Sequence, residues 1–149
     1  MYLSKEQVKK YRIMGRSMCE KYCTQRHERT SIIISIKSSW DRVLPNIYIS
    51  EENNVQGILR LTFDDLEYED DAKYCMQYQD GYLIAGFVRS WEGVDSIIAH
   101  CDGGISRSAG VMAAIMRVNE GSDHPVFDNK NKHPNMTSYL RTLKGFGYI

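Results

Sequence analysis

The chain has 149 residues, about the size of one domain, and it is long enough to bury a core without disulfides or metals. Hydrophobic residues make up 42% of the sequence and charged residues 26%, which excludes a disordered chain, a coiled coil and a collagen-like repeat. Nineteen Lys and Arg residues balance nineteen Asp and Glu residues, so the charge gives no indication of a nucleic-acid partner or an anionic membrane.

The apolar runs and the first residues of the chain bear on its compartment. The longest apolar runs, such as 110–116, are too short to span a bilayer. The first six residues include charges where a signal peptide needs an apolar stretch. The sequence therefore predicts a cytoplasmic protein without membrane contact, a single domain over residues 1–149, whose four cysteines remain thiols.

A helix is predicted to open the fold. Ser4 and Gln7 fit a capping box, in which each side chain accepts a hydrogen bond from the backbone N–H of the other residue. The helical pattern then runs to about Gln25, with a candidate break at Gly15. We expect this whole segment to be helical.

Short buried strands are predicted next. Three apolar, β-branched runs have the length and composition of such strands: 30–36, 56–63 and 94–100. A loop around Pro45 separates the first two runs and holds a candidate short strand at 47–49. An acidic loop follows at 64–71, and its acids at 69–71 are expected to be solvated residues at a helix start, where negative charge is favourable.

Helices are expected between and after these strands. Residues 72–91 place apolar side chains on one stripe, although Gly81 and Gly86 weaken the helical pattern. A helix rich in Ala, Val and Met is predicted over 107–119, and after a polar loop a last helix over 134–143. Strands that alternate with helices predict an α/β fold, with a short, mainly parallel sheet of four to five strands flanked by helices.

The most informative segment is 97–110, where a buried strand runs into a glycine-bearing loop and a helix follows. This geometry aims consecutive backbone N–H groups and the positive end of a helix at one place, which suits an anion. Cys101 opens the loop and Arg107 closes it. We expect the intervening loop residues to bind a phosphate group together with Arg107: Asp102, Gly103, Gly104, Ile105 and Ser106.

Three side chains in this segment have the chemistry of phosphate transfer. Cys101 lies at the floor of the cradle, where the N–H groups and the helix dipole favour its thiolate, a good nucleophile. The Arg107 guanidinium can hold two phosphate oxygens and stabilise their charge in the transition state. Ser108 can offer its hydroxyl to the sulfur and help the thiolate to leave in a second step.

The sequence His-Cys-Asp-Gly-Gly-Ile-Ser-Arg-Ser at 100–108 resembles the signature of cysteine-dependent protein tyrosine and dual-specificity phosphatases, His-Cys-x-x-Gly-x-x-Arg-Ser/Thr. It is most similar to small bacterial and phage tyrosine-phosphatase-like proteins, whose signature often reads His-Cys-Asp-Ala-Gly-x-Ser-Arg-Ser, with Gly103 in place of the alanine. The resemblance covers roughly 30–145, including 63–65 and 134–135, but only 100–108 is specific.

The resemblance implies a phosphatase-type phosphate-binding loop and a reaction through phosphocysteine, without cofactor or metal. It also implies an aspartate on a separate loop that protonates the leaving oxygen and then activates water. The match falls on 63–66, and alignment favours Asp65 as this general acid, with Asp64 as its rival. The implied substrate is a phosphorylated protein or a small phosphomonoester. Asp102 and the acidic loop disfavour polyphosphorylated lipids.

Three further features each allow two readings. His100 could transfer a proton, but its position at the strand end favours a buried hydrogen bond to the loop. Cys19, Cys23 and His27 recur at four-residue steps, as in a zinc site, but no fourth ligand lies nearby, so a partly buried helix face is favoured. Asn135 is either a residue in or near the active site or a helix N-cap.

Two other functions compete with a phosphatase. Sulfurtransferases of the rhodanese type and arsenate reductases also use a loop cysteine, but they need no acid, and Arg107 and Ser108 fit them less well. A phosphate-binding module with weak or no turnover is the other alternative. The presence of Cys101 together with Arg107 and Ser108 counts against it.

Overall fold

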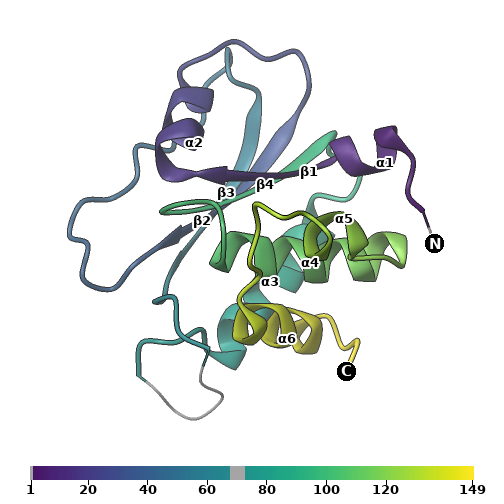
Figure 1. The fold of residues 1–149 in the computed structure, drawn as a ribbon. Helices are drawn as coiled ribbons and strands as arrows, with labels where there is room; N and C mark the ends of the chain where they lie inside the picture. Colours follow the sequence, from purple (N-terminus) through teal and green to yellow (C-terminus); the bar gives the residue numbers. More distant parts are fainter. Residues whose placement is uncertain (1, 68–72) are drawn as a thin grey trace.

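The computed structural model describes residues 2–67 and 73–149, and its central element is a parallel β-sheet (Figure 1). Within the described residues the sheet has four strands in the order β1-β4-β2-β3. These strands are β1 (Tyr11–Gly15), β2 (Ser31–Lys37), β3 (Val55–Thr62) and β4 (Ser96–Cys101). The predicted α/β class is confirmed, and every neighbouring pair of strands is parallel.

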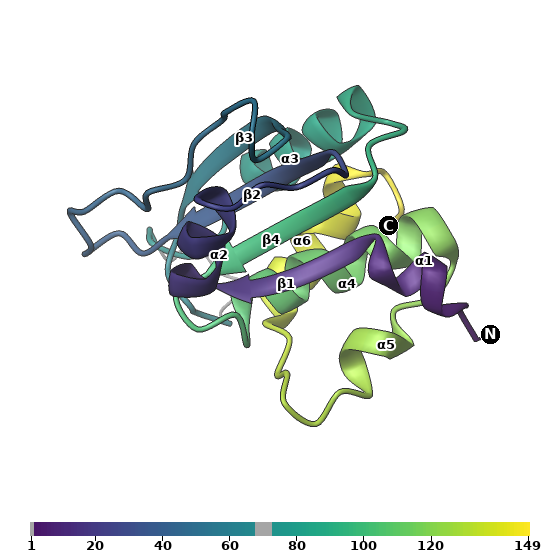
Figure 2. The same cartoon turned by 90° about the horizontal axis from the view of Figure 1, so that it is seen from above.

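Helices cover both faces of the sheet. They are α1 (Lys5–Lys9), α2 (Arg16–Cys23), α3 (Tyr78–Ser90), α4 (Arg107–Glu120), α5 (His124–Phe127) and α6 (Met136–Gly145). Helix α2 lies on one face, and α3, α4 and α6 lie on the other (Figures 1 and 2). None of the described helices is both long and apolar enough to cross a membrane.

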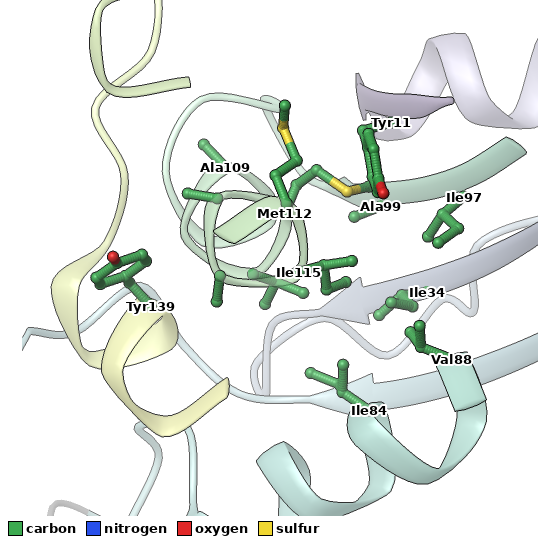
Figure 3. Packing of buried hydrophobic residues seen from close by; sticks show 14 of the residues in the cluster. Tyr11, Ile34, Ile84, Val88, Ile97, Ala99, Ala109, Met112, Ile115 and Tyr139 are labelled. Atoms are coloured by element: carbon green, nitrogen blue, oxygen red, sulfur yellow. The ribbon is translucent and has the colours of Figure 1, made fainter. Parts of the chain in front are cut away.

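The two central strands are buried on both faces, as expected for a parallel sheet between helices. In β2, Ile34 faces the larger core cluster while its neighbour Ile33 faces the smaller cluster under α2. Figure 3 shows Ile115 of α4 and Ile84 of α3 gathered with Ile34 in the larger cluster. Burial of these aliphatic side chains supplies the main driving force for the fold.

The N-terminal segment corrects one sequence prediction, because the expected helix to Gln25 is interrupted by strand β1. Tyr11 packs into the larger cluster and Met14 into the smaller one, so side chains alternate between the two faces as in any strand. Only α1, with the predicted Ser4–Gln7 capping box, and α2 are helical. A strand of five residues is too short to show its alternation between two helical patterns.

Three further boundaries differ from the predictions. Residues 47–49 form no strand, and Ile47 instead inserts into the core from a loop. Helix α3 begins at Tyr78, while the predicted start at Ala72 and the acids at 69–71 lie outside the described residues. The short helix α5 lies within the predicted polar loop, with Pro125 in its first turn, where proline is tolerated.

Because all four strands are parallel, their carboxyl ends meet at one edge of the sheet. The residues that directly follow these ends are Arg16, Ser38, Phe63 and Asp102. Backbone or side-chain hydrogen bonds connect all four of them, as described below. The fold therefore places residues from distant parts of the sequence around the loop after Cys101.

Candidate active site

The candidate site is the loop between β4 and α4. Helix α4 begins at Arg107, as the sequence predicted, and strand β4 ends at Cys101, one residue beyond the predicted end at His100. Gly104 has a φ of +69°, a conformation that favours glycine. A Cβ atom at this position would also lie 2.5 Å from the backbone N of Gly15, so the loop can approach β1 only because residue 104 is glycine.

The carbonyl oxygens of the loop are bound from outside. The backbone N–H of Arg16 donates to the Asp102 carbonyl oxygen, at 3.1 Å. A strap formed by residues 132–135 binds three more carbonyls: the Lys132 ammonium, the His133 N–H and the Asn135 N–H donate to Gly104, Ile105 and Ser106 in turn. In the described part of the chain, the N–H groups of residues 103–106 have no protein acceptor. They remain available to an anion.

The candidate nucleophile lies under this loop. The Cys101 side chain is buried, and its sulfur is 3.1 Å from the hydroxyl oxygen of Ser108, which is also buried. Ser108 belongs to the first turn of α4, so the sulfur also lies near the positive end of a helix. A hydroxyl at this distance can donate a hydrogen bond to a thiolate.

Arg107 is buried, and its guanidinium extends toward the carboxyl ends of β2 and β3. Its Nη1 donates to the hydroxyl of Ser38 at 2.9 Å and to the carbonyl of Phe63 at 2.8 Å. Its Nη2 forms an ion pair with the Asp102 carboxylate at 3.1 Å. Asp102, one of the predicted loop residues, thus contacts Arg107 through its side chain.

The two candidate acids point in different directions. Asp65 Oδ1 accepts hydrogen bonds from the Ser106 hydroxyl at 2.8 Å and from the Asn135 amide at 2.7 Å, so its carboxylate lies against the loop. Asp64 instead accepts from the backbone N–H and the hydroxyl of Ser39. Of the two acids, only Asp65 contacts the loop.

His100 is fully buried, and its Nε2 lies 2.6 Å from the Ser35 hydroxyl on the neighbouring strand. Its Nδ1 is 3.4 Å from the carbonyl oxygen of Cys101. Burial lowers the pKa of His100, because the charged imidazolium would lose its hydration, while the contact with the Cys101 carbonyl opposes this shift. The side chain is thus a neutral, structural hydrogen-bonding group on the α2 face of the sheet.

Two other sequence features have clear places in the structure. Asn135 fulfils both readings: its side chain caps α6 by accepting from the Ser138 N–H, and its amide donates to Asp65. Cys19 and Cys23 lie on the buried face of α2, and burial raises the pKa of the Cys19 thiol to about 12. Among the described residues no group of three or more His, Cys, Asp or Glu side chains could hold a metal ion.

Sequence reasoning missed the residues that support the loop from outside. Ser38 and Phe63 each follow the carboxyl end of a strand, which is the signal that could have indicated them. In the strap at 132–135 the sequence indicated only Asn135. The contacts of Lys132 and His133 had no such signal, because they run through a lysine ammonium and a backbone group. The site therefore contains more parts than the signature at 100–108.

Comparison with known proteins by sequence gives no match, either to a protein-family model or to a curated protein. Solved structures do match. Human DUSP28 has a TM-score of 0.55 at 17% identity, over 95% of this chain and 94% of its own. PTPMT1 in complex with PI(5)P has a TM-score of 0.53 at 14% identity, over 95% and 93%.

A third structure is a human tyrosine phosphatase-like serine/threonine/tyrosine-interacting protein, with a TM-score of 0.57 at 15% identity over 93% of this chain and 92% of its own. At such identities the likeness concerns the fold. The chain has the fold of the cysteine-dependent tyrosine and dual-specificity phosphatases, which confirms the expectation drawn from residues 100–108 at this level. The likeness to small bacterial and phage members stays a prediction.

Proposed function

We propose that the chain is a phosphomonoester hydrolase of the tyrosine or dual-specificity phosphatase type, with Cys101 as its nucleophile. The observation that carries this proposal is the convergence of the buried Cys101 sulfur, the free N–H groups of the loop and the Arg107 guanidinium at one edge of the sheet. These groups provide a nucleophile, a cradle for three phosphate oxygens and a compensating charge.

In the first step, the Cys101 thiolate attacks phosphorus and an S–P bond forms as the P–O bond to the leaving group breaks. The loop N–H groups and Arg107 stabilise the charge on the equatorial oxygens. Asp65, in its carboxylic acid form, gives its proton to the leaving oxygen. Its contacts with Ser106 and Asn135 keep it against the loop.

In the second step, the Asp65 carboxylate takes a proton from a water molecule, whose oxygen attacks phosphorus. The S–P bond breaks, inorganic phosphate leaves and the thiolate returns. The Ser108 hydroxyl, 3.1 Å from the sulfur, stabilises the departing thiolate by donating a hydrogen bond. Every proton and electron pair in this sequence belongs to the chain, the substrate or water, so the proposal needs no metal or cofactor.

A phosphorylated protein or a small phosphomonoester is the proposed substrate, and the cytoplasm the proposed compartment. The four cysteines are free thiols, as a reducing compartment would keep them. The PTPMT1 structure holds the phosphoinositide PI(5)P. Here the Asp102 carboxylate beside Arg107 and the Asp65 carboxylate against the loop would repel an additional phosphate group, so we expect phosphotyrosine peptides to be better substrates than phosphoinositides.

The direct test is hydrolysis of an aryl phosphate between pH 5 and 7 in the presence of a chelator, with wild type and Cys101→Ser compared. We expect turnover by the wild type and none by the variant, because a serine hydroxyl has no comparable anionic form at neutral pH. A wild type that binds tungstate but does not turn over would support the binding-module alternative. Activity of Cys101→Ser within about tenfold of wild type would refute the nucleophile assignment.

A further inference from the structure

The contacts of the Arg107 guanidinium extend beyond the catalytic signature. A guanidinium carries five N–H groups. The two on Nη1 donate to the Ser38 hydroxyl and the Phe63 carbonyl, and one on Nη2 donates to the Asp102 carboxylate. Two N–H groups remain, one on Nε and one on Nη2, with no acceptor in the described part of the chain.

Ser38 closes these contacts into a ring. Its hydroxyl accepts from Arg107 Nη1 and donates to Asp102 Oδ2, at 2.9 Å in both cases, while the same carboxylate oxygen accepts from Arg107 Nη2. The ring occupies the edge of the guanidinium formed by its two terminal nitrogens. The two remaining N–H groups share the other edge, and two parallel N–H groups on one edge match two oxygens of a phosphate.

We propose that Ser38, together with Asp102, is a positioning residue that fixes the plane of the Arg107 guanidinium so that its Nε–Nη2 edge faces the phosphate. The inference rests on the proposed function, since it assigns how that same site orients its cation. Ser38 is 3% exposed and Arg107 is 5% exposed, so neither side chain has room for many other arrangements. Orientation before binding saves the entropy that a freely rotating guanidinium would lose in the transition state.

Asp102 has a second part in this arrangement. A buried guanidinium without a counterion would be costly, and Asp102 supplies that counterion while the cradle holds no substrate. Its own side chain is 37% exposed, so its charge is partly screened by solvent and is compatible with an anion that binds on the opposite edge of the guanidinium.

The main test compares Ser38→Ala with Ser31→Ala. Ser31 is a buried serine at the other end of the same strand, so it controls for the loss of a buried hydroxyl. We expect Ser38→Ala to lower kcat/KM for an aryl phosphate by about 10- to 100-fold, the scale of a small misplacement of a catalytic group. Ser31→Ala should leave kcat/KM unchanged. Equal effects of the two variants would overturn the proposal.

A second measurement separates positioning from general stability. Tungstate binding is measured by calorimetry for wild type, Ser38→Ala, Arg107→Ala and the double variant. If Ser38 acts through Arg107, its replacement weakens tungstate binding in the wild-type background and has no further effect once Arg107 is alanine. An undiminished effect in the Arg107→Ala background would overturn the proposal, because Ser38 would then act through other groups.

Asp102→Ala breaks the ring from its exposed side and serves if Ser38→Ala does not fold. Because the loss of a carboxylate also helps an anion to bind, the readout for this variant is kcat, which we expect to fall; a raised kcat would contradict the proposal. A wild type without turnover, but with tungstate binding that depends on Ser38 through Arg107, would refute the proposed function and leave the positioning role standing. If the wild type turns over normally and Ser38→Ala has no effect, the proposed function stands and the positioning role is refuted.

Discussion

Two neighbouring glycines in the cradle differ in what they require. At Gly104 the φ of +69° and the close approach to Gly15 both exclude a side chain, whereas a Cβ at Gly103 would meet only Ile105, at 3.7 Å. We expect Gly104→Ala to lower the free energy of unfolding by about 1–3 kcal/mol or more. Gly103→Ala should change it little, in line with the alanine of the related signature. Urea denaturation of both variants measures the difference, and similar losses would contradict this account.

The assignment of the acid is tested by a second matched pair, Asp65→Asn and Asp64→Asn. Asp65 contacts the loop and Asp64 contacts Ser39. Asp65→Asn should lower kcat by about 10²–10⁴ for a substrate with a poor leaving group, and less for one with a very good leaving group. Steady-state kinetics with a series of aryl and alkyl phosphates measure this dependence. If Asp64→Asn shows it instead, the acid is Asp64.

Burial of His100 predicts a pH dependence of stability. Its folded-state pKa lies below the ordinary value of 6.5, so below pH 6.5 the unfolded chain binds a proton that the folded chain excludes. The free energy of unfolding should therefore fall as the pH drops below 6.5 and be insensitive to this group above it. Urea denaturation at several pH values tests this, and His100→Gln should flatten the profile. A wild-type profile that is already flat would contradict a neutral buried imidazole.

At the residue scale, the continuous motif at 100–108 could be predicted from spacing, and the resemblance added Asp65 and Asn135 from outside it. The other residues that contact the loop could not be predicted. Cys101 ends β4, and Arg107 and Ser108 begin α4, with only a short loop between them. Their spacing in the sequence therefore indicates that they lie close together. Ser38 lies 69 positions from Arg107 in the sequence, and its contact exists only because β2 and β4 are neighbours in the sheet. The spacing of residues along the chain does not indicate that β2 and β4 are neighbours.

At the element scale, helices α3 and α6 approach closely through a pair of glycines. A Cβ on Gly81 would overlap the Arg141 carbonyl oxygen, and one on Gly145 would overlap the Gly81 carbonyl oxygen. Gly86, in the same helix α3, has nothing within 4 Å of its Cβ position. Of the two glycines that weaken the helical pattern of α3 in the sequence, Gly81 is therefore required for helix packing and Gly86 is not.

This contrast predicts opposite effects of the same substitution. Gly86→Ala should raise the free energy of unfolding by about 0.5–1 kcal/mol, because alanine is a better helix former and the position is open. Gly81→Ala should lower it by about 1–3 kcal/mol, since the two helices must move apart. Thermal denaturation of both variants measures the effects, and a stabilised Gly81→Ala would refute the close packing of α3 and α6.

Strand β1 shows why element boundaries near the chain start could not be predicted. Its five residues contain two that are buried, Tyr11 and Met14, and their spacing of three also fits a helix face. The strand forms because it pairs with β4, from Tyr11 opposite Ile97 to Gly15 opposite Cys101. Pairing with a distant strand thus decides a local structure that the local pattern leaves open.

At the scale of the whole molecule, the alternation of strands and helices was sufficient to predict the α/β class, because parallel strands need long crossover connections, which are usually helices. Helices α2 and α3 connect strands in this way, whereas β2 and β3 are connected by a long loop. The strand order β1-β4-β2-β3 was not accessible from the sequence. That order places β4 between β1 and β2, so the loop after Cys101 is bounded by Arg16 on one side and Ser38 on the other. The topology thus assembles the candidate site from segments that are far apart in the chain.

If Cys101 is the nucleophile, it forms a covalent phosphate intermediate, and the mass of the trapped enzyme reveals this intermediate. Asp65→Asn is mixed with an aryl phosphate that has a very good leaving group, quenched in acid and analysed by peptide mass spectrometry. The first step then proceeds, while the second is slow without a group to activate water. The account predicts phosphate on the peptide that contains Cys101 and on no other. Phosphate on another residue, or turnover by the wild type without any trapped intermediate in the variant, would contradict it.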